Sequence, residues 1–191
     1  MQVCVYCASS ESIREVYFQQ AELLGQIFSQ ENIQVVYGGG GSGLMGRLAS
    51  SMIASGGKIK GIMPHFMKEI EWAHKHVTEW EFVSDMHERK RTFLENTDAV
   101  VALPGGVGTF EELLEVITWK KLGLFVKPIV IVNVEGYYDP LILMLQKCID
   151  EGFMSPIHGT MYEIVEDVKD VLPAIERSAP WNEDAIRFAK G

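Results

Sequence analysis

The sequence lacks several features that point to particular classes of protein. Its 17 Lys and Arg residues are outnumbered by 26 Asp and Glu residues, and the resulting formal net charge of −9 argues against binding to a nucleic-acid polymer. No apolar run approaches the ~18 residues needed to cross a bilayer, and the first residues lack the basic and apolar regions of a signal peptide. Because no repeat, linker or low-complexity segment is present, we expect one domain over residues 1–191, with a peripheral tail at 178–191.

Cysteine is also scarce, with only Cys4, Cys7 and Cys148 in the chain. An odd number without framework spacing predicts reduced thiols and a cytoplasmic protein. Cys4 and Cys7 have the spacing of a redox or zinc half-site, but they fall on a predicted strand, where residues three apart face opposite sides of a sheet. We therefore expect both in the core. Of the histidines, His74 and His76 alone have ligand spacing, and we expect neither a metal nor a cofactor.

What the sequence does contain is an alternation of short apolar runs and amphipathic stretches. Strands are predicted at 3–8, 35–37, 59–63, 81–83, 99–103, 128–132 and 162–165, and helices at 16–29, 44–55, 86–96, 113–122, 138–151 and 167–176. Residues 66–79 follow no regular pattern. Strands separated by helices of crossover length predict an α/β protein, a Rossmann-like three-layer α/β/α sandwich with a mostly parallel sheet.

Two glycine-rich loops follow predicted strands, one at 38–43 and one at 104–109. Glycine lets an anionic ligand approach the main chain closely, and the N–H groups of a following helix attract negative charge. Both loops lie at carboxyl ends of parallel strands, where ligands of such sheets bind. We therefore predict one phosphate cradle that contains Gly39, Gly40, Gly43, Gly106, Gly108 and Thr109. Residues 41–46 also match G-x-G-x-x-G, but that match follows the second strand and lacks the ribose-binding acid expected of a dinucleotide site.

Glu112 has two explanations at this stage. Thr109 and Glu112 have the spacing of a capping box, with Thr109 as the N-cap and Glu112 at N3. Alternatively, the two carboxylates of Glu111 and Glu112 beside a phosphate cradle indicate chemistry on a group attached to the phosphate. The sequence leaves both open.

The helix predicted at 86–96 carries Arg89, Lys90 and Arg91. Such a charge run is usually a solvated face. However, an anion binds beside two carboxylates only if positive charge compensates their repulsion. This helix can supply that charge, because it directly precedes the strand at 99–103. Arg89 and Arg91 lie on different sides of a helix, so we expect only one of them to reach the ligand.

Taken together, these motifs resemble the LONELY GUY family, the cytokinin-activating phosphoribohydrolases once mislabelled as lysine decarboxylases. Residues 104–112 resemble its PGGxGTxxE signature, and residues 85–90 resemble its MHxRK helix. Segments 36–46, 117–119 and 135–138 also fit, so the likeness covers roughly residues 3–153. The run of four glycines at 38–41 is one longer than usual, and Val107 stands where an aromatic residue is frequent.

The resemblance implies hydrolysis of the N-glycosidic bond of adenosine 5′-monophosphate or an N6-substituted cytokinin nucleotide, giving the free base and ribose 5-phosphate. It also implies a homodimer with its sites near the subunit interface. Arg89 and Glu112 would be the catalytic pair. The implied substrate-binding set is Glu71, Arg89, Lys90, Gly106, Val107, Gly108, Thr109, Phe110, Glu111, Glu112 and Thr118.

Two other functional classes stay open. One is a nucleotide- or cofactor-binding carrier of the same fold, such as a molybdenum-cofactor carrier, which would bind without turnover. The other is a decarboxylase, which would need a lysine for pyridoxal phosphate, and no lysine in the sequence has a context that supports this role.

Overall fold

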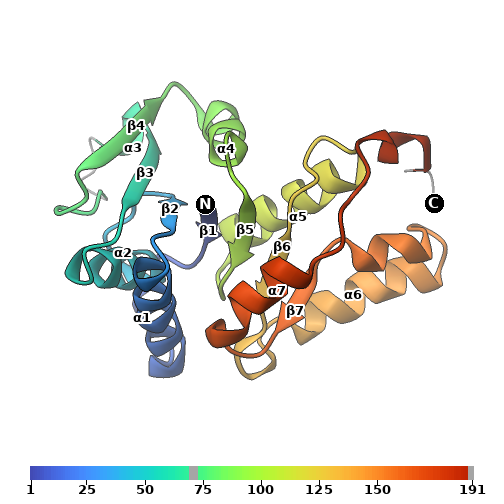
Figure 1. The fold of residues 1–191 in the computed structure, drawn as a ribbon, viewed down its shortest axis with the longest axis horizontal. Coiled ribbons are helices and arrows are strands. Elements are labelled where there is room, and N and C mark those ends of the chain that lie inside the picture. Colours follow the sequence, from blue (N-terminus) through green and yellow to red (C-terminus); the bar gives the residue numbers. More distant parts are fainter. Residues whose placement is uncertain (69–72, 189–191) are drawn as a thin grey trace.

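A computed structural model describes residues 1–68 and 73–188 and contains a seven-stranded parallel sheet (Figure 1). The strand order is β4-β3-β2-β1-β5-β6-β7, and every neighbouring pair is parallel. The strands are β1 (Gln2–Tyr6), β2 (Gln34–Tyr37), β3 (Ile59–Pro64), β4 (Glu79–Val83), β5 (Ala99–Ala102), β6 (Ile129–Val132) and β7 (Glu163–Val165). The order reverses at β1, which pairs with β2 on one side and with β5 on the other.

Helices cover both faces of the sheet, as the three-layer prediction requires. One face is packed by α1 (Glu15–Gln30), α2 (Gly43–Ala54) and α7 (Val171–Arg177). The other is packed by α4 (Met86–Leu94), α5 (Val107–Lys121) and α6 (Asp139–Asp150). The short helix α3 (His65–Lys68) follows β3, and 3₁₀ turns lie at Val134–Gly136, Pro156–Thr160, Val168–Asp170 and Glu183–Phe188.

Strand β1 shows how the alternation of side chains builds both core layers. Val3 and Val5 contact the layer beneath α1 and α2, whereas Cys4 and Tyr6 contact the layer beneath α4 and α5. Cys7 returns to the first layer, so Cys4 and Cys7 face opposite sides and are both buried free thiols. The expectation that they form core contacts and not a redox pair is confirmed.

The main departures from the predicted elements are at α5 and near the C-terminus. Helix α5 begins at Val107, six residues earlier than predicted, because Gly106 is its N-cap. The helix predicted at 167–176 is a 3₁₀ turn followed by α7. Of the predicted tail at 178–191, the described residues 178–188 add no strand to the sheet. Trp181 packs against the core, and Ala185 is fully buried.

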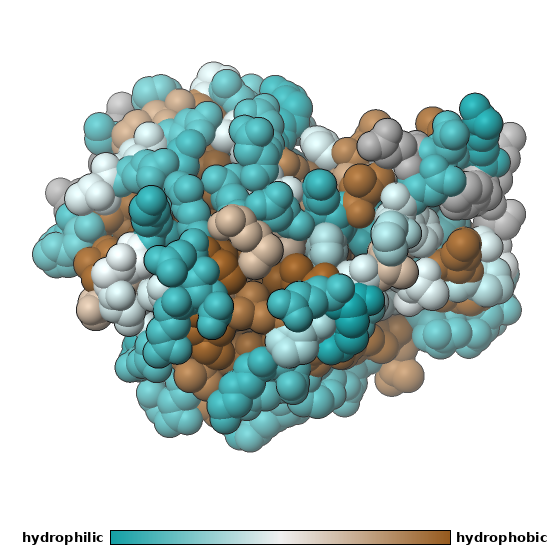
Figure 2. All heavy atoms as spheres, viewed as in Figure 1, coloured by the Kyte–Doolittle hydropathy of each residue, from teal (hydrophilic) through white to brown (hydrophobic). Residues whose placement is uncertain are grey.

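The surface is largely hydrophilic on the face in view, with apolar side chains gathered between α1 and α7 (Figure 2). Both helices contribute to the same core layer, so the apolar patch is where that layer reaches the surface. None of the described helices is both long and apolar enough to cross a membrane.

We expect Gly43→Ala to destabilise the fold more than Gly56→Ala. Both glycines have positive φ, 60° and 71°, so alanine costs about 1–2 kcal/mol at either position. At Gly43 a Cβ would in addition meet the main chain of Ser9 and lie 2.7 Å from the carbonyl oxygen of Ser10, whereas at Gly56 it would meet nothing within 4 Å. Thermal unfolding should show at least twice the loss in Tm for Gly43→Ala. Equal losses would contradict the close approach of the loop after β1.

Candidate active site

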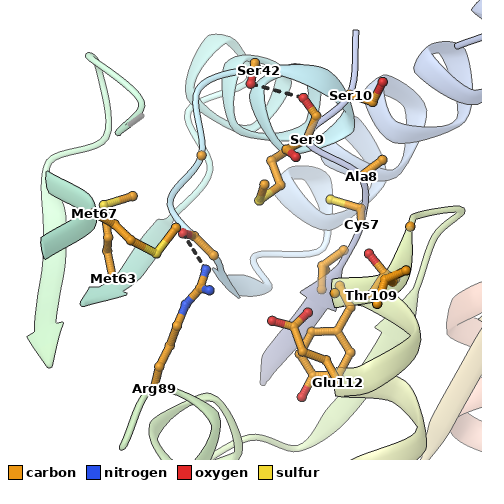
Figure 3. A pocket seen from close by; sticks show the side chains of 18 residues that line it. Cys7, Ala8, Ser9, Ser10, Ser42, Met63, Met67, Arg89, Thr109 and Glu112 are labelled. Carbon is orange, nitrogen blue, oxygen red and sulfur yellow. Dashed lines mark hydrogen bonds between the residues drawn. The ribbon is translucent and has the colours of Figure 1, made fainter. Parts of the chain in front are cut away.

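A cavity of about 460 Å³ opens at the carboxyl ends of the central strands (Figure 3). It lies where the strand order reverses, which is the position at which open α/β sheets bind ligands. Its walls come from four segments: the end of β1 and the loop after it, the glycine loop after β2, the end of β3 with α3, and the start of α5. Arg89 from α4 completes the wall.

Main-chain hydrogen bonds hold these segments together. The N–H of Ala8 donates to the carbonyl of Pro104 at 3.2 Å, and the N–H of Met45 donates to the carbonyl of Ala8 at 3.2 Å. The hydroxyl of Ser42 donates to the carbonyl of Ser9 at 3.1 Å (Figure 3). The loop after β1 therefore ties the start of α2 to the loop before α5, so the two glycine-rich loops face one cavity as predicted.

Two tyrosines fix the loop before α5. The hydroxyl of Tyr138 donates to the carbonyl of Leu103 at 2.7 Å, and that of Tyr137 donates to the carbonyl of Gly105 at 2.6 Å. The adjacent aromatic ring of Phe110 lies 6.4 Å from that of Tyr137 and 6.0 Å from that of Tyr138, so Phe110 belongs to this support and does not line the cavity.

The N-terminus of α5 forms one end of the cavity and presents N–H groups of the kind that suit an anion. The first three N–H groups of a helix, here those of Val107, Gly108 and Thr109, have no intrahelical acceptor. Neither Gly106 nor Gly108 has positive φ, and a Cβ on either would meet nothing within 4 Å. Backbone conformation and packing within the described residues therefore do not require glycine at these positions, and the open space leaves room for a ligand to approach the main chain closely.

The capping-box explanation of Glu112 is wrong. Helix α5 starts at Val107, so Gly106 is the N-cap, Thr109 is at N3, and Glu112 lies in the second turn. No side chain caps this helix. Thr109 is buried against Gly105 and lines the cavity, and Glu112 faces the cavity from one turn further along the helix (Figure 3).

Glu112 is a half-buried carboxylate without a hydrogen-bond or ion-pair partner among the described residues. Burial raises its pKa from the ordinary 4.5 to about 7, and the positive charge of Arg89 opposes part of that rise. The carboxylate also raises the pKa values of the buried groups Cys4, Tyr6 and Cys7 on β1 and just after it. A carboxyl group in a cavity with such a shifted pKa is a candidate for catalysis.

Arg89 enters the cavity from the opposite side (Figure 3). Arg89 is 7% exposed, and its guanidinium donates from Nε to the carbonyl of Ile62 at 3.1 Å and from Nη2 to the carbonyl of Gly38 at 2.9 Å. The ring of Phe93 lies 5.0 Å from its Cζ. Desolvation lowers the pKa of Arg89 and the charge of Glu112 raises it. Arg91 is exposed, in agreement with the prediction that the two arginines lie on different sides of the helix.

Several of the predicted site residues lie outside the cavity. Lys90 pairs with Glu111 and Glu115 on α5, at 2.6 and 3.1 Å. Thr118 is exposed, and its hydroxyl donates to the carbonyl of Leu114 at 2.7 Å. Glu71 falls outside the described residues. The cavity wall therefore contains Arg89, Gly40, Gly106, Val107, Gly108, Thr109 and Glu112 from the predicted set.

Two of the three glycines predicted to bind phosphate after β2 have structural reasons to be glycine. A Cβ on Gly39, whose φ is 79°, would lie 2.6 Å from the ring of Trp80. A Cβ on Gly43 would clash with the loop after β1. Gly40 does line the cavity, and a Cβ there would meet the methyl group of Met45 at 2.7 Å.

His74 and His76 belong to a local hydrogen-bond arrangement. The main-chain N–H of His76 donates to Nδ1 of His74 at 3.2 Å, and Nε2 of His74 lies 3.1 Å from the hydroxyl of Ser50. Burial and the neighbouring His76 both lower the pKa of His74. Within residues 1–68 and 73–188, no group of three or more His, Cys, Asp or Glu side chains could hold a metal ion.

Sequence reasoning missed the methionines at the far end of the cavity. Met45, Met63 and Met67 line it at the start of α2, the end of β3 and α3 (Figure 3). Their signal in the sequence was weak, because a methionine that ends a predicted strand or falls in a helix is usually a core residue. They make this end of the cavity apolar, in contrast to the N-terminus of α5.

We expect Glu112→Gln to stabilise the protein in a pH-dependent way. The raised pKa means that the folded state keeps the Glu112 proton when the unfolded chain has released it, so stability falls as pH rises from about 4.5 to about 7. Glutamine removes this loss. The Tm of Glu112→Gln should match that of the wild type near pH 4.5 and exceed it by at least about 2 °C above pH 7. The exposed control Glu11→Gln should show no such trend. A difference in Tm between Glu112→Gln and the wild type that did not change with pH would contradict the raised pKa of Glu112.

Comparison with known proteins now identifies relatives. The sequence model of a family described as "Possible lysine decarboxylase" matches residues 45–175. The chain is 40% identical to cytokinin riboside 5′-monophosphate phosphoribohydrolase LOG3 of Arabidopsis thaliana, over 95% of this chain and 84% of the relative. It is 38% identical to the probable enzyme LOGL2 of Oryza sativa subsp. japonica, over 98% of this chain and 77% of the relative.

Solved structures share the fold at lower identity. A molybdenum cofactor binding protein from Rippkaea orientalis superposes with a TM-score of 0.69 at 18% identity, covering 92% of this chain and 94% of that one. The Moco carrier protein of Chlamydomonas reinhardtii gives a TM-score of 0.68 at 18% identity, with 92% and 95% covered. These likenesses concern the fold alone. The sequence matches go further, and they show that the chain belongs to the family of the cytokinin riboside 5′-monophosphate phosphoribohydrolases.

Proposed function

We propose that this protein hydrolyses the N-glycosidic bond of adenosine 5′-monophosphate or of its N6-substituted, cytokinin-type derivatives. The products are the free base and ribose 5-phosphate. The names of the relatives support this substrate class. The observation that carries the proposal is the placement of Glu112 and Arg89 on opposite sides of one cavity whose other groups include a free helix N-terminus.

The strand order supports one direction for the substrate. The 5′-phosphate lies against Gly106, Gly108 and Thr109 at the start of α5, which follows β5. At the other end of the cavity, Met63 lies near the end of β3 and Met67 follows in α3, and β3 is three strand spacings from β5, or roughly 14 Å. A nucleotide extended along this line puts its ribose beside Glu112 and its base toward Arg89. The apolar methionine end suits a purine that carries an apolar N6 substituent.

The chemistry follows from charge development on the ribose. As the bond between C1′ and the base nitrogen breaks, positive charge builds up on the ribose ring. The ionised Glu112 carboxylate stabilises that charge and orients the water whose oxygen attacks C1′. The electrons of the broken bond leave with the base nitrogen. The water gives its oxygen and one hydrogen to C1′, and its second proton ends on the base. Arg89 stabilises the departing base through the guanidinium N–H groups that the carbonyls of Ile62 and Gly38 do not use. Arg89 also favours the ionised form of Glu112 near neutral pH.

The two competing functions have different requirements. A carrier of the same fold would bind its ligand in this cavity without breaking a bond, and base release from the nucleotide distinguishes the two. A pyridoxal-phosphate decarboxylase would need a lysine in the cavity, and no lysine is among the described residues that line it. The buried Lys120, whose pKa burial lowers to about 8, donates to the carbonyl of Lys127 at 2.9 Å and lies outside the cavity.

We also propose a cytoplasmic homodimer with its sites near the subunit interface. Three free cysteines suit a reducing compartment. Val107 is 83% exposed at the cavity and Leu114 is 39% exposed on the same helix, which suits coverage by a second copy. Thr118 lies outside the cavity of its own chain, so the resemblance-based role for it would require the site of the partner.

We expect Glu112→Gln to lower kcat for AMP by ~10²–10³, the usual cost of losing one such electrostatic contact. Substrate affinity should be kept or improved, because a negative charge near the bound phosphate is removed. Arg89→Ala should also abolish turnover, whereas the matched control Arg91→Ala should be near wild type because Arg91 is exposed. Chromatography of released base measures each rate. A folded, fully active Glu112→Gln protein would remove Glu112 from the mechanism.

We expect the 5′-phosphate to be required, and Gly108→Ala to weaken its binding. Alanine is favoured over glycine inside a helix by up to ~1 kcal/mol, so Gly108→Ala should be at least as stable as the wild type. Its added methyl group projects into open space at the anion-binding end. The KM for AMP should rise, while any turnover of adenosine should stay unchanged. Equal turnover of AMP and adenosine by the wild type would disprove the phosphate cradle.

A further inference from the structure

Lys90 makes the side-chain polar contacts between α4 and α5. Its ammonium lies 2.6 Å from a carboxylate oxygen of Glu111 and 3.1 Å from one of Glu115, and its side chain is only 13% exposed. Glu111 and Glu115 are four residues apart on α5 and therefore share one face of the helix. Among the described residues, no other ion pair or side-chain hydrogen bond joins the two helices.

The residues beside this ion-pair cluster are the two that face each other across the cavity. Lys90 follows Arg89 on α4, and Glu111 precedes Glu112 on α5. Arg89 is anchored to the ends of β2 and β3 through Gly38 and Ile62. Glu112 has no comparable anchor among the described residues. Lys90 is therefore the polar side-chain link through which α4 holds α5, and with it Glu112, at a set distance from Arg89.

We propose that Lys90 is a positioning residue, which fixes the separation of Arg89 and Glu112 by clamping α4 to α5 and does not bind substrate itself. The inference rests on the proposed function, because it assigns Lys90 a part in that reaction. It differs from the direct substrate contact implied by the family resemblance. Lys90 is not part of the cavity wall, and its ammonium is already bound to two carboxylates.

The charges around Glu112 give the proposal a second consequence. On α5, Glu111 and Glu115 raise the pKa of Glu112, while on α4 Arg89 and Lys90 lower it. The groups that face it from β1 and the residue after it, Cys4, Tyr6 and Cys7, are held neutral by burial. Removing Lys90 thus leaves two unpaired carboxylates near Glu112 and raises its pKa. Removing both partner carboxylates lowers it.

The test compares Lys90→Met, Lys90→Arg and the double variant Glu111→Gln/Glu115→Gln with the wild type. Lys90→Met and the double variant both break the clamp, so both should lose roughly 10–100-fold in kcat for AMP, because a displacement of ~1 Å can cost ~10² in rate. Their KM values should change less than about threefold. Lys90→Arg should retain most of the activity. The acid limb of the pH profile should move to higher pH in Lys90→Met and to lower pH in the double variant.

A matched control removes another paired lysine. Lys147→Met breaks the surface pair with Glu151 on α6 at 3.0 Å and should leave kcat, KM and the pH profile unchanged. Direct substrate binding by Lys90 predicts a different pattern: KM for AMP would rise in Lys90→Met, and the double variant, which frees the ammonium, would keep its kcat. That pattern would overturn the positioning role.

One measurement does not depend on enzymatic activity, and it separates a failure of this inference from a failure of the proposed function. If the wild type released no base, the proposed function would fail. The carboxyl titration of Glu112, followed by NMR on ¹³C-labelled glutamate, would still test the coupling to Lys90. We expect the Glu112 pKa to rise in Lys90→Met and to fall in the double variant, and an unchanged pKa in both would refute the proposal. If Lys90→Met failed to fold, the double variant and Lys90→Arg would carry the test.

Discussion

The parallel pairing of β1 with β5 is the constraint on which the site depends. The chain runs outward from β1 through β2 to β4 and returns to add β5 on the other side, so the loops after β1 and β5 separate above the sheet. The hydrogen bond from Ala8 to Pro104 joins them at their base. The start of α5 and the glycine loop after β2 thereby become opposite walls of one cavity, although they are more than 60 residues apart in the sequence.

In this cavity, two charged side chains have no ion-pair partner among the described residues. Arg89 is buried with two of its guanidinium N–H groups on main-chain carbonyls, and Glu112 is a carboxylate with a raised pKa and no direct partner among the described residues. Each group costs stability when it is charged and desolvated. A ligand that brings an anion to the helix N-terminus and a developing cation to Glu112 would offset this cost. A structural carboxylate would instead be paired, as Glu115 is.

The sequence was sufficient for the features that depend on periodicity. Alternating strands and helices predicted the parallel three-layer fold, and the positions of Cys4 and Cys7 predicted opposite faces of β1. It was insufficient for features that depend on contacts between segments distant in the sequence. The pattern at Thr109 and Glu112 is a typical capping box with Thr109 as the N-cap. The N-cap is instead Gly106, three residues before Thr109, so the helix begins at Val107. Tyr137 and Tyr138 hold the preceding loop from a distant segment, and no local pattern encodes that.

The pairing of Lys90 and the roles of the glycines illustrate the same limit. Whether a lysine on a charged helix contacts solvent, substrate or a neighbouring helix depends on the placement of two helices, which a single-helix pattern leaves undetermined. Glycines are equally ambiguous in sequence, since packing, positive φ and ligand approach all select for them. The structure separates these causes: Gly39 and Gly43 are glycine because Trp80 and the loop after β1 occupy the space of a Cβ, whereas Gly106 and Gly108 face open space. Contacts within the described residues explain the first pair but not the second, and the second pair lies at the N-terminus of the helix that carries Glu112.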